Sequence, residues 1–220
     1  MSPTPERVKQ LLESADFGDR LKAVNLIREL EPAIGFELLK TAAADSNVRV
    51  RYAAVSQFTT LGPQNRTETE ALLRQALMTD PEPDVQAAAA DALGGLQCTD
   101  AFEDLQSVYH ATEEWLVKFS IIAALGELGD RRAFELLQSA LDSSNELVAT
   151  AAIGSLGELR DDRAIPILLK YVDADDWQVR HRVVQALRQF DTPETKAALE
   201  TLSQDTAAAV AETAKHHLGN

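Results

Sequence analysis

The chain contains 220 residues, of which 45% are hydrophobic, and it carries a formal net charge of −14. This charge argues against tight nucleic-acid binding, which requires lysine and arginine side chains to displace counterions from phosphates. The single cysteine, Cys98, precludes an internal disulfide, and no apolar run approaches the length of a membrane-spanning helix. We therefore expect a cytoplasmic protein that neither binds nucleic acid nor inserts into a membrane.

A valine recurs along the chain at intervals of 31 to 35 residues. The six positions are Val50, Val85, Val117, Val148, Val179 and Val210. Apolar or small residues follow each of the first five valines after four, eight and eleven positions, and these offsets lie on one face of an α-helix. One interval earlier, Asp19 stands in the place of the valine before the same apolar pattern. A period of this length indicates a stacked helical repeat.

Each repeat is predicted to contain two helices. An apolar segment about eleven residues before each valine, such as Leu38-Leu39, indicates the first helix, and the valine belongs to the second. Capping and turn-forming residues lie between the two, as in Asp45-Ser46-Asn47. The first helix of the chain is predicted near residues 3–14 and the last near residues 206–218.

The predicted fold is therefore an all-α solenoid of about seven short helical pairs. We expect it to form a single repeat domain over residues 1–220, with an N-terminal cap at about 1–31 and a C-terminal cap at about 193–220. In such arrays each repeat contacts its neighbours, and the second helices line a concave face that commonly binds a partner.

Positions two, six and nine after each valine point away from the apolar face and predict the binding surface. The candidate binding residues on and beside it are Tyr52, Asp91, Trp115, Phe119, Trp177, Arg180 and His181. Small residues between them, at Ala87, Ala123, Gly126 and Gly154, would form a smooth floor. Two interpretations stay open: the small residues line a trough for a partner, or they permit close packing of neighbouring helices. The tryptophans would edge this trough or be buried between repeats.

The titratable residues form no complete catalytic or metal site in the sequence. Glu212 and His216 are four residues apart, but one carboxylate and one imidazole are too few ligands for a metal. Cys98 has no histidine at a spacing that would activate it, so we expect an unreactive thiol. His181 is the one histidine on the predicted trough and is the candidate for a proton transfer. The catalytic residues, if the protein is an enzyme, are otherwise unknown.

The repeat pattern resembles the short HEAT repeat. The segments that carry the resemblance are Val50-Arg51-Tyr52-Ala53-Ala54, Ala123 to Asp130 and Val179-Arg180-His181-Arg182-Val183. The resemblance implies that Arg51 and Arg180 order the turns of their repeats. Iron-dependent hydroxylases built from HEAT repeats carry paired His-Glu dipeptides, and this chain contains none, so we expect no metal centre.

Within the HEAT-repeat proteins, the chain is similar to the cyanobacterial phycobilin lyase-related group. The matching segments are Pro5 to Leu12, Phe17 to Arg20, Val50 to Gln57, Glu114 to Gly126 and Trp177 to Leu187. That group attaches bilins to phycobiliprotein cysteines or removes them, and it includes relatives that dismantle the phycobilisome. The resemblance implies phycobiliprotein subunits or the phycobilisome as partners. It also implies a phycocyanobilin-type ligand with no permanently bound cofactor.

The resemblance also implies roles for the candidate residues. Tyr52, Trp115, Phe119 and Trp177 would stack on the pyrrole rings, while Asp91 would accept hydrogen bonds from the ring nitrogens. Arg180 or Arg182 would hold the propionates, because a guanidinium matches a carboxylate bidentately. His181 would transfer the proton needed to detach a thioether-linked bilin. The alternative is a non-enzymatic scaffold that binds a partner protein on the same face.

Overall fold

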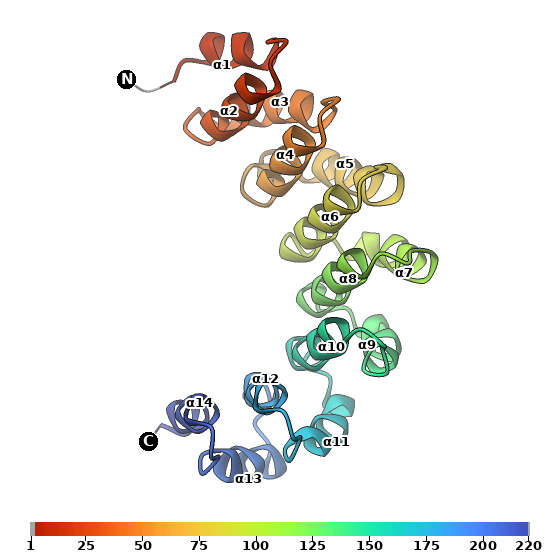
Figure 1. Cartoon of the computed structure of the whole chain (residues 1–220), viewed down its shortest axis with the longest axis vertical. Helices are drawn as coiled ribbons and strands as arrows, with labels where there is room; N and C mark the ends of the chain where they lie inside the picture. Colours follow the sequence, from red (N-terminus) through yellow and green to blue (C-terminus); the bar gives the residue numbers. More distant parts are fainter. Residues whose placement is uncertain (1–2, 220) are drawn as a thin grey trace. The chain divides into compact units, whose positions relative to one another are not determined.

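The computed structural model describes residues 3–219, which contain fourteen α-helices, five short 3-10 helices and no strand (Figure 1). The α-helices are α1 (Pro5–Leu12), α2 (Phe17–Ile27), α3 (Pro32–Ala43), α4 (Val48–Leu61), α5 (Arg66–Thr79), α6 (Pro83–Gly95), α7 (Phe102–Ala111), α8 (Trp115–Leu128), α9 (Phe134–Ala140), α10 (Glu146–Glu158), α11 (Ile165–Leu168), α12 (Trp177–Leu187), α13 (Pro193–Leu202) and α14 (Ala208–Leu218). The 3-10 helices are η1 (Gly62–Asn65), η2 (Thr99–Ala101), η3 (Arg131–Ala133), η4 (Asp162–Ala164) and η5 (Leu169–Tyr171). Odd-numbered and even-numbered α-helices alternate as the first and second members of seven pairs. The predicted α-solenoid is confirmed.

The second helix of each pair is called the B helix below, and α2, α4, α10 and α12 each begin with a side-chain cap. The side chains of Asp16, Asn47, Asn145 and Asp176 each accept a hydrogen bond from a backbone N–H in the first turn of the following helix. Such caps satisfy donors that have no partner inside the helix. The Asp and Asn residues of these turns therefore set where these four B helices start.

The chain divides into two compact units, Met1–Ile121 and Ile122–Asn220, with the boundary inside α8. In the first unit, α2, α4 and α6 pack side by side as a layer of B helices, and α3 and α5 pack behind them (Figure 1). In the second unit, α10, α12 and α14 form the corresponding layer, with α9, α11 and α13 behind. The single domain over residues 1–220 stays a prediction.

The repeat valines form the centre of the core in both units. Val50, Val85, Val117, Val148 and Val210 have no solvent-exposed surface. Val179 is the exception, because it is only partly buried. The apolar residues four and eight positions after each of the first five valines are buried as well, which is why this period could be recognised in the sequence. Burying such side chains is the main favourable contribution to folding.

Asp161 is a buried carboxylate at the turn after α10, where only 1% of the residue is exposed. The side chains of Arg163 and Arg131 donate to it at 2.9 and 3.0 Å. Its pKa is lowered below the ordinary value of 3.8, chiefly by the Arg163 hydrogen bond, against an opposing effect of desolvation. A carboxyl whose pKa is lower in the folded state stabilises the fold above its unfolded pKa, and this contribution is lost as the pH falls through the folded pKa.

We therefore expect Asp161→Asn to be less stable than the wild type at neutral pH, with a difference that shrinks as the pH falls below 3.8. Urea unfolding at a series of pH values measures this difference. Asparagine keeps the shape of the turn, so a loss of stability that did not change with pH would contradict the electrostatic explanation.

Candidate functional site

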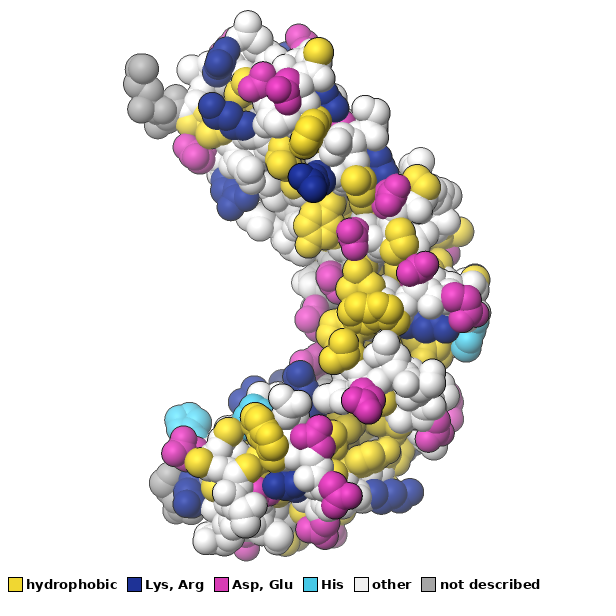
Figure 2. All heavy atoms as spheres, in the orientation of Figure 1, with side chains coloured by type: hydrophobic (Ala, Val, Ile, Leu, Met, Phe, Trp, Pro, Cys, Tyr) yellow, Lys and Arg dark blue, Asp and Glu magenta, His cyan; other side chains and the backbone are white. Residues whose placement is uncertain are grey.

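The seven candidate binding residues are divided between the two units. Tyr52, Asp91, Trp115 and Phe119 belong to the first unit, and Trp177, Arg180 and His181 belong to the second. Each unit has a groove among the first turns of its B helices. Hydrophobic side chains reach the surface of both units on the face shown in Figure 2.

The groove of the first unit, called the Asp91 groove below, has a volume of about 390 Å³. Residues of α4, α6 and the first turns of α8 line it, and they include Tyr52, Ala87, Ala88, Asp91 and Ser120. Tyr52 is 48% exposed, whereas both alanines are largely buried beneath the groove. The sequence pattern therefore brought Tyr52 and Asp91 together correctly, above a floor that includes Ala87.

Asp91 lies exposed at the groove, yet its carboxyl has an altered pKa. Desolvation by the surrounding protein atoms raises this pKa, and a hydrogen bond donated by the buried Ser120 hydroxyl opposes the rise. The residue as a whole is open to solvent, so we take the desolvation to be partial. A partly desolvated carboxylate beside an aromatic ring gains from a cationic or N–H donor ligand, because opposite charge favours the ionised form.

Trp115 and Phe119 lie outside the residues that line the Asp91 groove. They are four positions apart on α8, which places them on one side of the helix. Trp115 is 47% exposed and Phe119 is partly buried. The interpretation in which Trp115 is buried between repeats is therefore wrong.

The predicted smooth floor is wrong at Gly126, because neighbouring helices pack against the small residues there. A Cβ atom on Gly126 would lie 2.7 Å from Ser155 Cα, and one on Gly157 would lie 2.5 Å from Ala186 Cα. Gly154 is instead covered by the Arg182 side chain. These glycines permit close approach of B helices, which was the alternative left open by the sequence.

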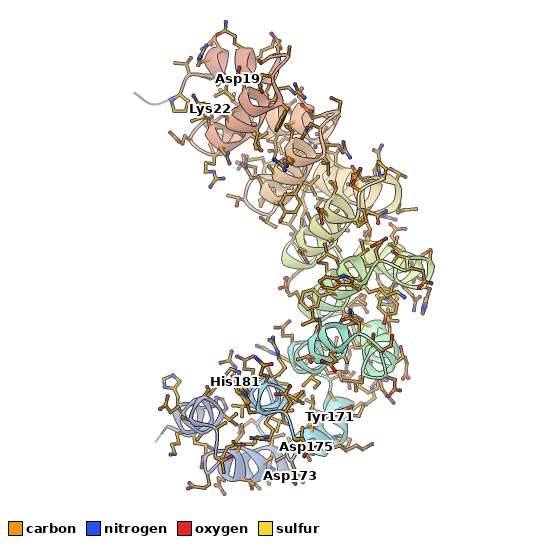
Figure 3. The ribbon with its side chains drawn as sticks, in the orientation of Figure 1. Asp19, Lys22, Tyr171, Asp173, Asp175 and His181 are labelled. Atoms are coloured by element: carbon orange, nitrogen blue, oxygen red, sulfur yellow. The ribbon has the colours of Figure 1, made fainter. Side chains whose placement is uncertain are left out.

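The groove of the second unit, called the Trp177 groove below, has a volume of about 690 Å³. It lies among the first turns of α10 and α12 and the turn before α12, and its lining includes Leu147, Tyr171, Trp177, His181 and Arg182. Trp177 is 46% exposed and Leu147 is 54% exposed. Tyr171 and His181, labelled in Figure 3, come from η5 and α12.

His181 forms a hydrogen bond that fixes its protonation pattern. Its Nε2 lies 3.1 Å from Thr213 Oγ1, and the Thr213 hydroxyl donates its one proton to the Ala209 carbonyl at 2.8 Å. The Nε2 atom must therefore carry the proton that it shares with Thr213, which leaves Nδ1 as the acceptor in the neutral ring. The imidazole is partly buried at the groove.

Arg180 is held in place by the fold. Its guanidinium donates to both carboxylate oxygens of Asp205, at 2.6 and 2.9 Å, and to the carbonyls of Ala174 and Asp175. It does not line the Trp177 groove, whereas Arg182 does. The expected role of Arg180 in ordering a turn is thus observed, and of the two arginines only Arg182 faces the groove.

Several lining residues had no signal in the sequence pattern. Ser120 is a single polar residue on α8, and Tyr171 is a single aromatic residue in the short helix η5. Ala149 and Ala174 also line the Trp177 groove, and alanines carry no chemical signal of their own. The contacts across repeats that make these residues neighbours follow only from the spatial register of the helices.

The remaining titratable residues add no second site. Within residues 3–219, no group of three His, Cys, Asp or Glu side chains is arranged to hold a metal ion. Cys98 is buried, and burial raises the pKa of its thiol, which disfavours the reactive thiolate. In the same residues, no helix is long and apolar enough to cross a membrane.

The model of the HEAT-repeat family matches residues 70–157 and 134–219, and the chain therefore belongs to the HEAT-repeat family. The chain is similar to a structure of the complex of CpcE and CpcF of phycocyanin lyase from Nostoc sp. PCC7120, with 21% identity and a TM-score of 0.65. That match covers 100% of this chain and 95% of the other. The chain is also similar to an archaeal HEAT-like repeats protein from Thermococcus onnurineus NA1, with 14% identity, a TM-score of 0.57, and coverage of 98% and 95%.

These structural similarities concern the fold. None of the curated proteins compared with this chain matches it.

Proposed function

We propose that this HEAT-repeat protein binds phycobiliprotein subunits of the phycobilisome and contacts their bilin chromophore through the Asp91 groove. One observation carries the proposal: the exposed Tyr52 and the partly desolvated carboxyl of Asp91 line the same groove, together with buried alanines. The sequence resemblance to the phycobilin lyase-related group supports the choice of ligand. So does the similar fold of CpcE and CpcF in phycocyanin lyase.

The chemistry of the groove suits an open-chain tetrapyrrole. The Tyr52 ring offers a face on which a pyrrole ring can stack, and the alanine floor admits a flat ligand. The Asp91 carboxylate can accept hydrogen bonds from pyrrole N–H groups, and a protonated ring nitrogen would lower the pKa that desolvation has raised. Binding a conjugated, partly cationic ligand thus relieves an electrostatic cost already present in the free protein.

Within that group, the sequence resembles the phycobilisome-degradation protein NblB, and we propose that this protein acts in the same process. Detaching a thioether-linked bilin requires a proton transfer, for which His181 is the candidate. Trp115, Phe119 and Trp177 are proposed as further aromatic contacts, and Arg182 as a partner for the propionates. These residues are not all in one groove, so they would contact different parts of a large partner.

The proposal is tested by mixing the purified protein with intact phycocyanin and separating the species by size while recording the visible spectrum. Bilin absorbance that shifts or falls and co-elutes with this protein would support bilin handling. Co-elution with an unchanged spectrum would support the alternative, a scaffold that binds the antenna protein. The exposed Trp115, Leu147 and Trp177 side chains at the starts of B helices favour that second function. If the bilin protein does not co-elute and the spectrum does not change, both functions are contradicted.

Two variants are expected to weaken phycocyanin binding by about tenfold or more, because contacts at the centre of an interface commonly contribute this much. Tyr52→Ala removes the stacking surface, and Asp91→Asn removes the anionic acceptor while keeping the shape. Binding is measured by titration followed in the visible spectrum. Met78→Ala is the matched control, because Met78 is 54% exposed on α5, outside the B helices. Equal binding by all three variants would exclude the Asp91 groove as the contact.

A further inference from the structure

Three arginines link consecutive repeats in the same way, and we call each link a staple. In a staple, the fourth residue of a B helix is an arginine, and its guanidinium pairs with an aspartate three residues before the next B helix. The three staples are Arg20–Asp45, Arg51–Asp80 and Arg180–Asp205. Every pair is bidentate, with N–O distances of 2.6 to 3.0 Å.

Each staple also fixes the turn before its own B helix. The remaining guanidinium nitrogen of Arg180 donates to the carbonyls of Ala174 and Asp175 at 2.6 and 3.0 Å. Arg20 and Arg51 donate to the carbonyls five and six residues before them in the same way. A guanidinium thus fills the space between a B helix and the following turn.

Of the six junctions between consecutive B helices, three have a staple and three have other residues at the two positions. The pairs without a staple are Gln86 and Thr112 between α6 and α8, Lys118 and Ser143 between α8 and α10, and Ala149 and Ala174 between α10 and α12. Ala149 is the fourth residue of α10, and Ala174 lies three residues before α12, so two alanines occupy the places of the arginine and the aspartate. Both alanines line the Trp177 groove. Val179, the one repeat valine that is only partly buried, lines it as well. The groove therefore opens where the three stapled junctions hold an ion pair.

The acceptors for a guanidinium remain in place around the two alanines. The carbonyls of Ser143 and Ser144 are equivalent to those bound in a staple, and they accept no hydrogen bond from the residues that the structure describes. The Glu146 and Asp176 side chains, both among the lining residues, add carboxylates at the helix starts. The exposed Trp177 ring supplies a face on which a guanidinium can stack.

We propose that the Trp177 groove binds an arginine side chain of a partner protein, which supplies from outside the guanidinium that the three stapled repeats supply themselves. The apolar walls at Leu147 and Val179 would cover the aliphatic part of that side chain. Arg182 also lines the groove, but its guanidinium bonds to Gln185 and its stem packs over Gly154. The net charge of −14 favours the approach of a basic segment. This site lies in the second unit and does not depend on bilin binding at the Asp91 groove.

The test uses N-acetyl-L-arginine amide as the probe and Trp177 as the reporter. Trp115→Phe leaves Trp177 as the only tryptophan of the chain, so its fluorescence reports on the groove. We expect a saturable change with the arginine amide and binding of N-acetyl-L-lysine amide that is about tenfold weaker, because lysine lacks the planar fork of donors. No saturable change, or an equal response to lysine, would overturn the proposal.

A second variant fills the groove from within. Ala149→Arg/Ala174→Asp, made in the Trp115→Phe background, rebuilds the staple and is expected to abolish the response to the arginine amide. The matched control is Gln86→Arg/Thr112→Asp, because Gln86 and Thr112 occupy the two staple positions of the junction between α6 and α8, which has no staple. It should leave the response unchanged. Binding that survived in the first double variant would contradict the proposed site.

A third variant keeps the test decisive if the rebuilt staple disturbs folding. Glu146→Gln/Asp176→Asn removes both carboxylates, and asparagine at position 176 still caps α12. We expect it to bind the arginine amide about tenfold more weakly than its parent, since charge-assisted hydrogen bonds are lost. Unchanged affinity would exclude these carboxylates from the site and overturn the proposal.

Discussion

Replacing Gly157 with alanine is expected to lower the free energy of unfolding by about 2–3 kcal/mol, because the added methyl group has no space. The Cβ atom would lie 2.5 Å from Cα, 2.7 Å from Cβ and 2.9 Å from the carbonyl oxygen of Ala186. Two of these three atoms belong to the backbone of α12 and cannot rotate away. The substitution must push α10 and α12 apart, although alanine is the better helix former by about 1 kcal/mol.

Thermal unfolding followed by far-ultraviolet circular dichroism measures this loss, which corresponds to a fall in Tm of about 5–10 °C. Gly154→Ala is the matched control on the same helix. Its Cβ would meet only the flexible Arg182 side chain, with the nearest atom at 3.1 Å. We expect it to be neutral or stabilising by up to about 1 kcal/mol. Equal stability of the two variants would show that the contact between α10 and α12 is not tightly packed.

Replacing Arg51 with alanine is expected to cost about 2 kcal/mol, the next largest effect. The substitution removes four hydrogen bonds, two to Asp80 and two to the carbonyls of Asp45 and Ser46. It also leaves the Asp80 carboxylate, whose side chain is 9% exposed, without its cation. Both partners are largely covered, so the pair is worth more than an exposed surface ion pair.

Urea unfolding of Arg51→Ala, with Arg49→Ala as its control, measures this contribution. Arg49 lies on the same helix, is exposed and takes part in no ion pair within the described residues. Its removal should change stability by less than about 0.5 kcal/mol. Arg51→Lys should recover only part of the loss, because an ammonium group cannot bind Asp80 and both carbonyls in the same planar arrangement. Full recovery by lysine would contradict the importance of bidentate geometry.

The helical repeat was predictable because its valines and their apolar followers are buried at a constant helical spacing. The turns were predictable for a similar reason, since the Asp and Asn caps act on backbone groups within their own turn. Tyr52 and Asp91 could be placed on one surface because positions two and six after a repeat valine lie on the same side of a B helix. All these inferences require only that each repeat resembles the next.

The errors and omissions arise where neighbouring repeats differ. Gly126 appeared to be an open surface position, but the helix that covers it brings Ser155 within contact. Arg180 has a guanidinium that could bind a carboxylate ligand, yet this group is already bound to Asp205. The Trp177 groove was not foreseen as a separate site. It depends on Ala149 and Ala174, which are 25 residues apart and occupy the positions where a staple has its arginine and its aspartate. Such features follow from the register between repeats, which one repeat considered alone does not contain.

The staples also decide which repeats could be exchanged. Each staple joins an arginine of one repeat to an aspartate of the next, so excising α3 and α4 together would place Arg20 opposite Asp80 and restore an equivalent pair. Excising α11 and α12 would instead place Ala149 opposite Asp205 and leave that carboxylate without an arginine. The array is therefore modular at its N-terminal end, where repeats share compatible junctions, and it is not modular at the Trp177 groove. A designer who shortened or extended this protein would insert or remove repeats at the first place and leave the second intact.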